Sequence, residues 1–444
     1  MKARYRSCLI EKRVRILILG AYGFIGSEIA RSLNAKHQVS GFGRDLGYAK
    51  RLLPTVKWVK GDLKDFTSPE SWTPLLVDVD VVINASGILQ SGPSDSLETS
   101  QSKAIIALIE ACETTNIKQF IQISAAGADI KATTDFLSSK AKADARLAEA
   151  KFPYLILRPG LVIGRNAYGG TELIRSIAAL PYIQPSIPIL ASIQTVGMTD
   201  LVEAVNRGVT DPARYGGIVD LVETKGRSLT EIVAAHRDWL GIGRASFAVP
   251  LPLSMLRAIS LIADALGWLG WRSPLRRNAV LSLLGGVSGN AEDSAPLLGR
   301  RVAPLEDVLA AMPAGKQDRW HARLALLLPA MLFSLVLLWL GSGILGLVRA
   351  DAAALILTQR GLASELATIF VATGSVVDIA IGIGLMVRRT VQPALLASIL
   401  MTLFYWGGAA IFAFDLWLDP LAPMLKTVPS MMIAAACYAM LDKR

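Results

Sequence analysis

Only three cysteines and three histidines occur in the 444-residue chain. They are scattered along its length: Cys8, Cys112, Cys437, His37, His236 and His321. This scatter contains neither a disulfide framework nor the paired spacing of a zinc site. We therefore expect no metal centre.

Uninterrupted apolar runs long enough to cross a membrane are missing before Trp320. The basic segment Met1–Arg13 has no apolar core, so we expect no cleaved signal peptide. The formal charge is +10, but no basic stripe alternates with aromatic residues, which argues against a nucleic-acid partner. The hydrophobic fraction of 52% comes largely from residues beyond Trp320, so the sequence predicts a soluble domain followed by a membrane domain.

A strand, a glycine-rich turn and a helix start occur close to the N-terminus. The apolar run Ile16–Leu19 predicts a strand buried on both faces of a parallel sheet. Gly20, Gly23 and Gly26 follow it directly. Glycines there allow backbone N–H groups and a helix N-terminus to approach a dinucleotide pyrophosphate. We therefore predict a cofactor loop that also includes Tyr22, Phe24 and Ile25.

Strand and helix patterns then alternate as far as residue 160. The predicted strands cover residues 16–19, 37–42, 56–59, 79–83, 120–123 and 154–157. This alternation indicates an α/β fold, a doubly wound parallel Rossmann sheet with a small substrate-side subdomain. A ligand of such a sheet binds at the carboxyl ends of the strands. Those ends hold Gly20, Arg44, Asp62, Ala85, Ser124 and Pro159.

Arg44 follows the second predicted strand, where NAD-specific proteins usually place an acidic residue on the ribose. A cation there suits a 2′-phosphate. We therefore predict a preference for NADP(H), with NAD(H) as the alternative and a solvated loop residue as the structural explanation of Arg44.

The ordered motifs resemble the atypical or extended short-chain dehydrogenase/reductase superfamily over about residues 13–309. They are Gly20-x-x-Gly23-Phe24-Ile25-Gly26, Gly61-Asp62-Leu63, Asn84-Ala85-Ser86-Gly87, Ile123-Ser124-Ala125, Lys140 and Leu157-Arg158-Pro159-Gly160. The resemblance implies that Asp62 holds the adenine and that the turn Asn84–Gly87 faces the cofactor. The complete expected set is Gly20, Tyr22, Gly23, Phe24, Ile25, Gly26, Arg44, Asp62, Leu63, Ala85, Ser86, Gly87, Ser124, Lys140 and Pro159.

One catalytic position departs from this superfamily. Ser124 and Lys140 match its catalytic serine and lysine, but Phe136 stands where the family has a tyrosine. A phenyl ring cannot donate a proton. Tyr154 or Tyr168 could replace the tyrosine, or Lys140 could support a different reaction. Alternatively, the cofactor is bound without catalysis, as in the similar branch of the 39-kDa accessory subunit of respiratory complex I and of NmrA-like sensors.

The apolar segment 255–269 is followed by tryptophans and arginines, including Trp271 and Arg272. It predicts either a helix at a membrane surface or a helix that closes over the substrate pocket; the two readings are compatible. We expect a domain at residues 13–248, pocket-closing or amphipathic helices and a linker at 249–318, and a membrane domain at 319–444.

Four apolar runs follow, at about residues 324–348, 362–387, 391–414 and 427–441. They predict an all-α four-helix transmembrane bundle, the last run being short. Their number and placement resemble the DoxX-like family, which implies a link to the quinone pool or to a membrane redox complex. The flanking cations are Arg319, Arg323, Arg388, Arg389, Lys443 and Arg444, which predicts that the Rossmann domain and the C-terminus are cytoplasmic.

Asp378 lies within the second apolar run. A carboxylate at that depth is costly and suggests a site, such as a proton path. We instead expect Asp378 to reach the interface beside Arg388 and Arg389. Trp339, Tyr405, Trp406 and Trp417 are expected as interfacial anchors.

Taken together, the sequence predicts a membrane-anchored NADP(H)-binding oxidoreductase in a bacterial-type inner membrane. Its small-molecule substrate is unknown and is expected to be lipophilic or quinone-linked. The alternative is a non-catalytic, cofactor-binding accessory or sensor subunit of a membrane complex.

Overall fold

The computed structural model describes residues 13–87, 96–186, 191–271, 273 and 275–441. Cys8, Arg272, Lys443 and Arg444, which the sequence analysis named, lie outside these ranges. The chain divides into two compact units. The first ends at Lys316, and the second contains the rest together with the short segment Asp264–Ser273.

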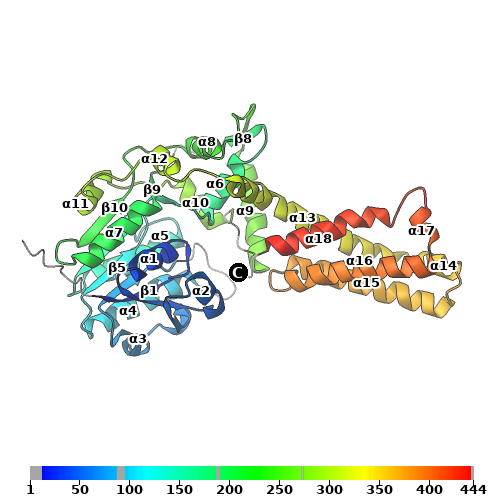
Figure 1. Ribbon diagram of the computed structural model, residues 1–444, viewed down its shortest axis with the longest axis horizontal. Coiled ribbons are helices and arrows are strands. Elements are labelled where there is room, and N and C mark those ends of the chain that lie inside the picture. The colour runs from blue at the N-terminus through cyan, green and yellow to red at the C-terminus, as the bar shows by residue number, and fades with distance from the viewer. Residues whose placement is uncertain (1–12, 88–95, 187–190, 272, 274, 442–444) are drawn as a thin grey trace, which may run out of the picture. The chain divides into compact units, whose positions relative to one another are not determined.

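Seven parallel strands form the central sheet of the first unit, in the order β10-β6-β5-β4-β1-β2-β3 (Figure 1). Their bounds are β1 (Arg15–Leu19), β2 (Gln38–Gly43), β3 (Lys57–Lys60), β4 (Val81–Asn84), β5 (Gln119–Ile123), β6 (Tyr154–Pro159) and β10 (Gly217–Leu221). The predicted doubly wound Rossmann sheet is confirmed. Strand β10, which the sequence pattern did not predict, pairs with β6 at the edge of the sheet.

The two faces of the sheet are covered by different helices. In β1, Ile16 and Ile18 face a core completed by α1 and α7, whereas Leu17 and Leu19 face α3, α4 and α5. This alternation buries each strand on both sides, which explains its continuous apolar sequence. The helices of this unit are α1 (Phe24–Asn34), α2 (Leu46–Leu52), α3 (Pro69–Leu76), α4 (Ala104–Glu113), α5 (Asp135–Ala148), α6 (Gly170–Ala178), α7 (Met198–Thr210), α8 (Leu229–Trp239), α10 (Arg277–Leu284), α11 (Ser294–Leu298) and α12 (Leu305–Ala310). Helix α9 (Leu253–Trp268) begins in this unit and ends in the second.

Two small parallel sheets lie outside the main sheet. One pairs β7 (Leu161–Ile163) with β9 (Thr195–Gly197), and the other pairs β8 (Ile183–Ser186) with β11 (Phe247–Pro250). These strands, with helices α6 to α8, come after the sixth strand of the Rossmann pattern. They therefore occupy the part of the chain that the sequence assigned to the substrate side.

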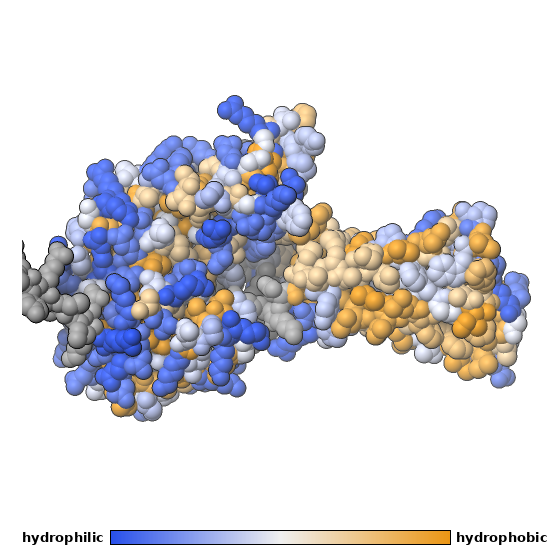
Figure 2. Space-filling view, in the orientation of Figure 1, coloured by the Kyte–Doolittle hydropathy of each residue, from blue (hydrophilic) through white to orange (hydrophobic). Residues whose placement is uncertain are grey.

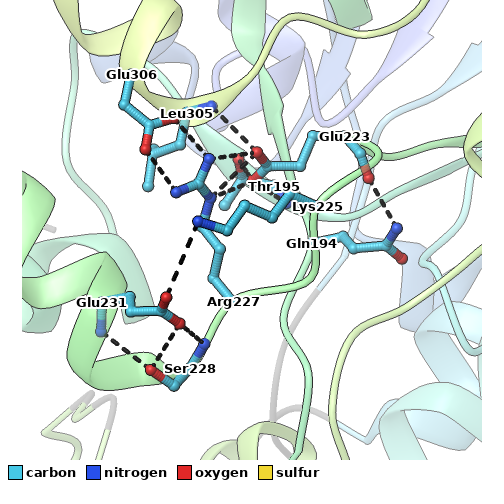
Figure 3. A network of polar contacts seen from close by, with 9 residues as sticks. All are labelled: Gln194, Thr195, Glu223, Lys225, Arg227, Ser228, Glu231, Leu305 and Glu306. Atoms are coloured by element: carbon cyan, nitrogen blue, oxygen red, sulfur yellow. Dashed lines mark hydrogen bonds and ion pairs between the residues drawn. The ribbon is translucent and has the colours of Figure 1, made fainter.

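A buried ionic network joins this region to α12 (Figure 3). Glu223, which follows β10, accepts hydrogen bonds from Thr195 Oγ1 at 2.6 Å, from Arg227 Nη2 at 2.9 Å and from the Leu305 N–H at 3.2 Å. The second guanidinium face of Arg227 donates to Glu306 at 2.6 Å. Because both charges of the Glu223–Arg227 pair are buried, removal of either side chain would leave an uncompensated charge in the interior.

Glu306→Gln should lower the free energy of unfolding by about 1 kcal/mol, because Arg227 keeps Glu223 while it loses a solvent-exposed partner. Glu292→Gln is the matched control, since its ion pair with Arg301 is exposed on both sides. That control should change stability by less than about 0.5 kcal/mol. Thermal unfolding of the full chain in detergent measures both, and equal effects would contradict the assigned role of the network.

The second unit is helical: α13 (Lys316–Val348), α14 (Ala350–Thr358), α15 (Ser364–Met386), α16 (Val391–Phe412), α17 (Asp415–Leu418) and α18 (Val428–Met440). Figure 2 shows hydrophobic side chains along the surface of this bundle. Among the described residues, α13, α15 and α16 are long and apolar enough to cross a membrane. α18 has 13 residues, about 20 Å of helix, so its crossing stays a prediction.

Asp378 lies in the interior of this bundle. It is 3% exposed and accepts hydrogen bonds from Ser342 Oγ of α13 and Tyr405 Oη of α16, each at 2.8 Å. The prediction that Asp378 reaches the interface beside Arg388 and Arg389 is therefore wrong. Tyr405 is a partner of Asp378 rather than an anchor, and Trp339 is buried in the core. Polar contacts of this kind hold apolar helices together in a membrane.

Candidate functional site

The glycine loop between β1 and α1 is tightly packed. Gly20 has a φ of +70°, and a Cβ there would lie 2.8 Å from the carbonyl oxygen of Ala85 and from the Cα of Ser86. The N–H of Gly23 donates to the Gly20 carbonyl at 2.8 Å. A Cβ on Gly26 would overlap that same carbonyl oxygen. Gly20 and Gly26 are therefore required by the backbone path, and a side chain at either position would displace the turn. A Cβ on Gly23 would lie 3.0 Å from the Gly20 carbonyl oxygen, a tight contact.

The N-terminus of α1 directly follows this turn. Its N-cap is Gly23, which supplies no side-chain cap, and its first turn contains Phe24, Ile25 and Gly26 without an acidic residue. Such a terminus offers backbone N–H groups and a positive dipole end to an anion. The residues thus fit the pyrophosphate of a dinucleotide, the group that the glycine pattern predicts.

Tyr22 connects the glycine loop to the end of β2. Its hydroxyl accepts a hydrogen bond from the Arg44 N–H at 3.2 Å, and its ring fills the space above Gly43. The Arg44 guanidinium lies 3.8 Å from Asp62 Oδ2, and the Lys64 ammonium lies 3.5 Å from the same oxygen. The structure thus brings the predicted adenine-side residues together at the ends of β2 and β3. Leu63 begins the short 3-10 helix that follows Asp62.

The segment after β4 forms a turn closed by Asn84. The Asn84 side-chain oxygen accepts from the Ser86 N–H at 3.0 Å and from the Ser86 hydroxyl at 2.5 Å. Its amide donates to Gln122 of β5 at 2.9 Å. Because Ala85 and Ser86 also contact Gly20, the ends of β1, β4 and β5 meet at this turn. The turn Asn84–Gly87 therefore lies beside the glycine loop.

Lys140 is buried close to this turn. It is 5% exposed, and its ammonium donates to the Ile123 carbonyl at the end of β5 at 2.9 Å. A Cβ on Gly87 would lie 3.6 Å from Lys140 Nζ, and the Phe136 ring centre lies 5.7 Å from it. Burial lowers the pKa of Lys140 to about 8, although Asp144 opposes this shift. Phe136 therefore lies one turn before Lys140 on α5, in the position that the resemblance assigns to the catalytic tyrosine.

Asp144 is a site residue that sequence reasoning missed. It lies one turn after Lys140 on α5, is buried, and accepts a hydrogen bond from Ser124 Oγ at 2.5 Å and an ion pair from Arg158 at 3.4 Å. Burial raises the pKa of Asp144, while Ser124, Lys140 and Arg158 oppose this rise. The spacing of four residues from Lys140 was a signal in the sequence. Pro159, also predicted, ends β6, and its carbonyl accepts from the Ala126 N–H at 2.9 Å.

The two tyrosines considered as substitutes for Phe136 lie in different places. Tyr154 is the first residue of β6, at the end of the sheet opposite to the glycine loop. It is therefore wrongly placed for catalysis there. The Tyr168 ring instead stacks on Phe24 of α1, with 6.5 Å between ring centres. Tyr168 is thus close to the loop, while Phe136 is close to Lys140.

Two segments of the chain match known protein families. Residues 20–176 match the NAD(P)H-binding family, and residues 336–435 match the DoxX-like family. No curated protein matches the chain.

Two crystal structures resemble this chain in fold. That of gox2253 has a TM-score of 0.51 at 19% identity, over 70% of this chain and 99% of that chain. That of the Bordetella bronchiseptica enzyme WbmG in complex with NAD has a TM-score of 0.52 at 15% identity, over 72% of this chain and 97% of that chain. The chain therefore joins a Rossmann domain that matches the NAD(P)H-binding family to a C-terminal membrane domain that matches the DoxX-like family.

Proposed function

We propose that this protein is a membrane-anchored, NADP(H)-dependent oxidoreductase. The observation that carries the proposal is the burial of Lys140 beside Gly87 and the end of β5. A buried ammonium with one backbone acceptor is costly to the fold. Its retention at the predicted cofactor site is explained if it hydrogen-bonds a bound dinucleotide and takes part in proton transfer.

The nicotinamide group would supply a hydride. The chain's own residues would bind the cofactor and transfer the proton. Gly20 to Gly26 would bind the pyrophosphate, and the turn at Asn84 would position the adjoining part of the cofactor. Lys140, with its pKa lowered to about 8, holds and releases a proton near neutral pH. Phe136 leaves this lysine as the titratable group next to the position of the missing tyrosine hydroxyl.

Arg44 supports the preference for NADP(H). Arg44→Ala should weaken NADPH binding about tenfold, that is by about 1.4 kcal/mol, because the cation opposite a 2′-phosphate is removed. NADH binding should change less than about threefold. Arg15→Ala, at the amino end of β1, is the control and should leave both unchanged. Calorimetric titration of the full chain in detergent measures these affinities, and equal losses for both cofactors would contradict the preference.

Because the second unit is a membrane domain, we expect the substrate to be lipophilic. A quinone is the first compound to test. Oxidation of NADPH by the full chain in vesicles, with and without a short-chain quinone, tests the activity. Quinone-dependent oxidation that Lys140→Met abolishes would support the proposal. An absence of oxidation with quinones and with lipophilic carbonyl compounds would contradict it.

Phe136 also supports a second function, a non-catalytic accessory or sensor protein that holds the cofactor for stability. In that case Phe136→Tyr should create no activity, and NADPH should raise the thermal midpoint of the chain. We further propose that the Rossmann domain faces the cytoplasm. In support, Arg388 and Arg389 lie at one end of α15, while the ion pair between Arg360 and Asp415 lies beyond the other.

A further inference from the structure

The stretch 247–268 is apolar and largely uncovered. All four residues of β11, Phe247–Pro250, are exposed, and β11 leads through Leu251 and Pro252 directly into α9. On α9, Leu261 and Ile262 are each 64% exposed and Trp268 is 77% exposed. The whole stretch carries only Arg257 and Asp264 as charged residues. Exposed apolar residues gathered in one stretch of chain indicate an interaction site.

α9 buries only a narrow stripe against the rest of the chain. That stripe consists of Leu256, Ser260, Ala263 and Gly267, which recur at helical spacing. The exposed apolar side chains lie on the remainder of the helix. A helix that only closed over a pocket would need the buried stripe alone. The outer face therefore requires another explanation.

The C-terminal end of α9 belongs to the second unit. Gly270, with a φ of +89°, ends the helix, and the N–H of Trp271 donates back to the Leu266 carbonyl at 3.2 Å. The Trp271 indole then donates to the Met386 carbonyl at 2.6 Å, and the Arg388 N–H donates to the Leu269 carbonyl at 2.9 Å. Because α15 ends at Met386, residues 269–271 lie at the end of a spanning helix.

The end of a spanning helix is where hydrocarbon gives way to lipid headgroups. Arg388 and Arg389 follow α15 there, as cations usually do at a membrane boundary. Trp268 lies next to this boundary, and tryptophan favours that layer. Ile262 lies about 10 Å of helix away from residue 269, at 1.5 Å per residue. The exposed face of α9 therefore adjoins Trp268, the residue that we expect in the boundary layer.

We propose that the surface formed by β11 and the outer face of α9 is seated in the headgroup layer of the bilayer. The apolar side chains contact acyl chains, and the exposed Arg257 contacts lipid phosphates. These lipid contacts bind the first unit to the membrane in addition to the covalent connections at residues 263/264, 273/274 and 316/317. It does not depend on whether the protein is catalytic.

Photo-cross-linking of the full chain in native membranes tests the proposal. The photoreactive residue p-benzoylphenylalanine replaces Phe247, Ile262 or Trp268 in separate variants, with Leu261 as a second position on α9. Phe370, exposed on α15, is the lipid-facing reference. Val77 and Ile130 are the matched controls, because they are 74% and 60% exposed apolar residues elsewhere on the first unit. Only variants that keep the thermal midpoint of the parent chain are compared.

Lipid adducts at Phe247, Ile262 and Trp268 should approach the yield at Phe370 and exceed the yields at Val77 and Ile130 at least about tenfold, as expected for side chains among acyl chains. Adducts to a second copy of the chain would overturn the proposal and assign the surface to a dimer. Yields no higher than at Val77 would also overturn it, because the surface would then face water.

Discussion

Gly20→Ala should weaken NADPH binding on the order of 100-fold, about 2.7 kcal/mol. Two physical effects act together. The new Cβ would lie 2.8 Å from backbone atoms of both Ala85 and Ser86, which no side-chain rotation can relieve. The φ of +70° is also unfavourable for alanine. The loop must therefore move away from the Asn84 turn, and the N–H groups at the start of α1 lose their alignment on a pyrophosphate.

Gly217→Ala is the matched control for this prediction. Gly217 has a φ of +86°, so the backbone strain is similar, but its Cβ would meet open space. It begins β10 and thus lies at the amino end of the sheet, away from the glycine loop. Calorimetric titration with NADPH should give wild-type affinity for this variant. Similar losses in the two variants would show that strain alone matters and that the Gly20 loop does not bind the cofactor.

The local parts of the Rossmann fold could be predicted because their signals are short in sequence. Strands β1 and β4 contain apolar runs and are followed by small residues, and the glycine loop is continuous in the chain. Strand β10 was missed because Gly217–Leu221 begins with glycine and includes Asp220, which interrupts its apolar pattern. Its place in the sheet depends on pairing with β6, about 60 residues earlier in the chain.

Long-range polar contacts could not be predicted in the same way. The hydrogen bond from Ser124 to Asp144 joins β5 to α5, and the ion pair of Arg227 with Glu306 spans 79 residues. Which residues form such pairs depends on which helix covers which strand end. The hydrophobic periodicity of the sequence does not determine that arrangement. The same limit explains Asp378, whose partners Ser342 and Tyr405 come from two other helices. The closeness of Asp378 to Arg388 in the sequence suggested a position at the membrane interface, but helix packing buries the carboxylate inside the bundle.

Lys140→Met should stabilise the cofactor-free protein by about 2 kcal/mol at pH 7. Burial lowers the Lys140 pKa from 10.5 to about 8. That shift costs the folded state about 3 kcal/mol, because each pKa unit corresponds to about 1.4 kcal/mol. Methionine fills a similar volume without charge. The Ile123 carbonyl loses its donor, however, which lowers the gain in stability by about 1 kcal/mol. The thermal midpoint should therefore rise by several degrees.

The pH dependence of this gain has a defined sign. Below pH 8 the lysine is protonated in both the folded and the unfolded chain, so the wild type carries the full penalty and the variant has its largest advantage. Between pH 8 and 10.5 the unfolded chain binds a proton that the folded chain does not, so wild-type stability rises with pH. The advantage of Lys140→Met should shrink over that range. Thermal unfolding of both proteins from pH 6.5 to about 9.5 measures it.

Lys142→Met, two residues further along α5, is the matched control, because Lys142 is exposed and pairs with Glu98. It should change stability by less than about 0.5 kcal/mol at every pH. The same two variants also separate function from folding. Lys140→Met should weaken NADPH binding about tenfold despite its greater stability, whereas Lys142→Met should bind normally. A Lys140→Met protein that is more stable and still binds NADPH like the wild type would show that this lysine does not hold the cofactor, and the proposed oxidoreductase would lose its central residue.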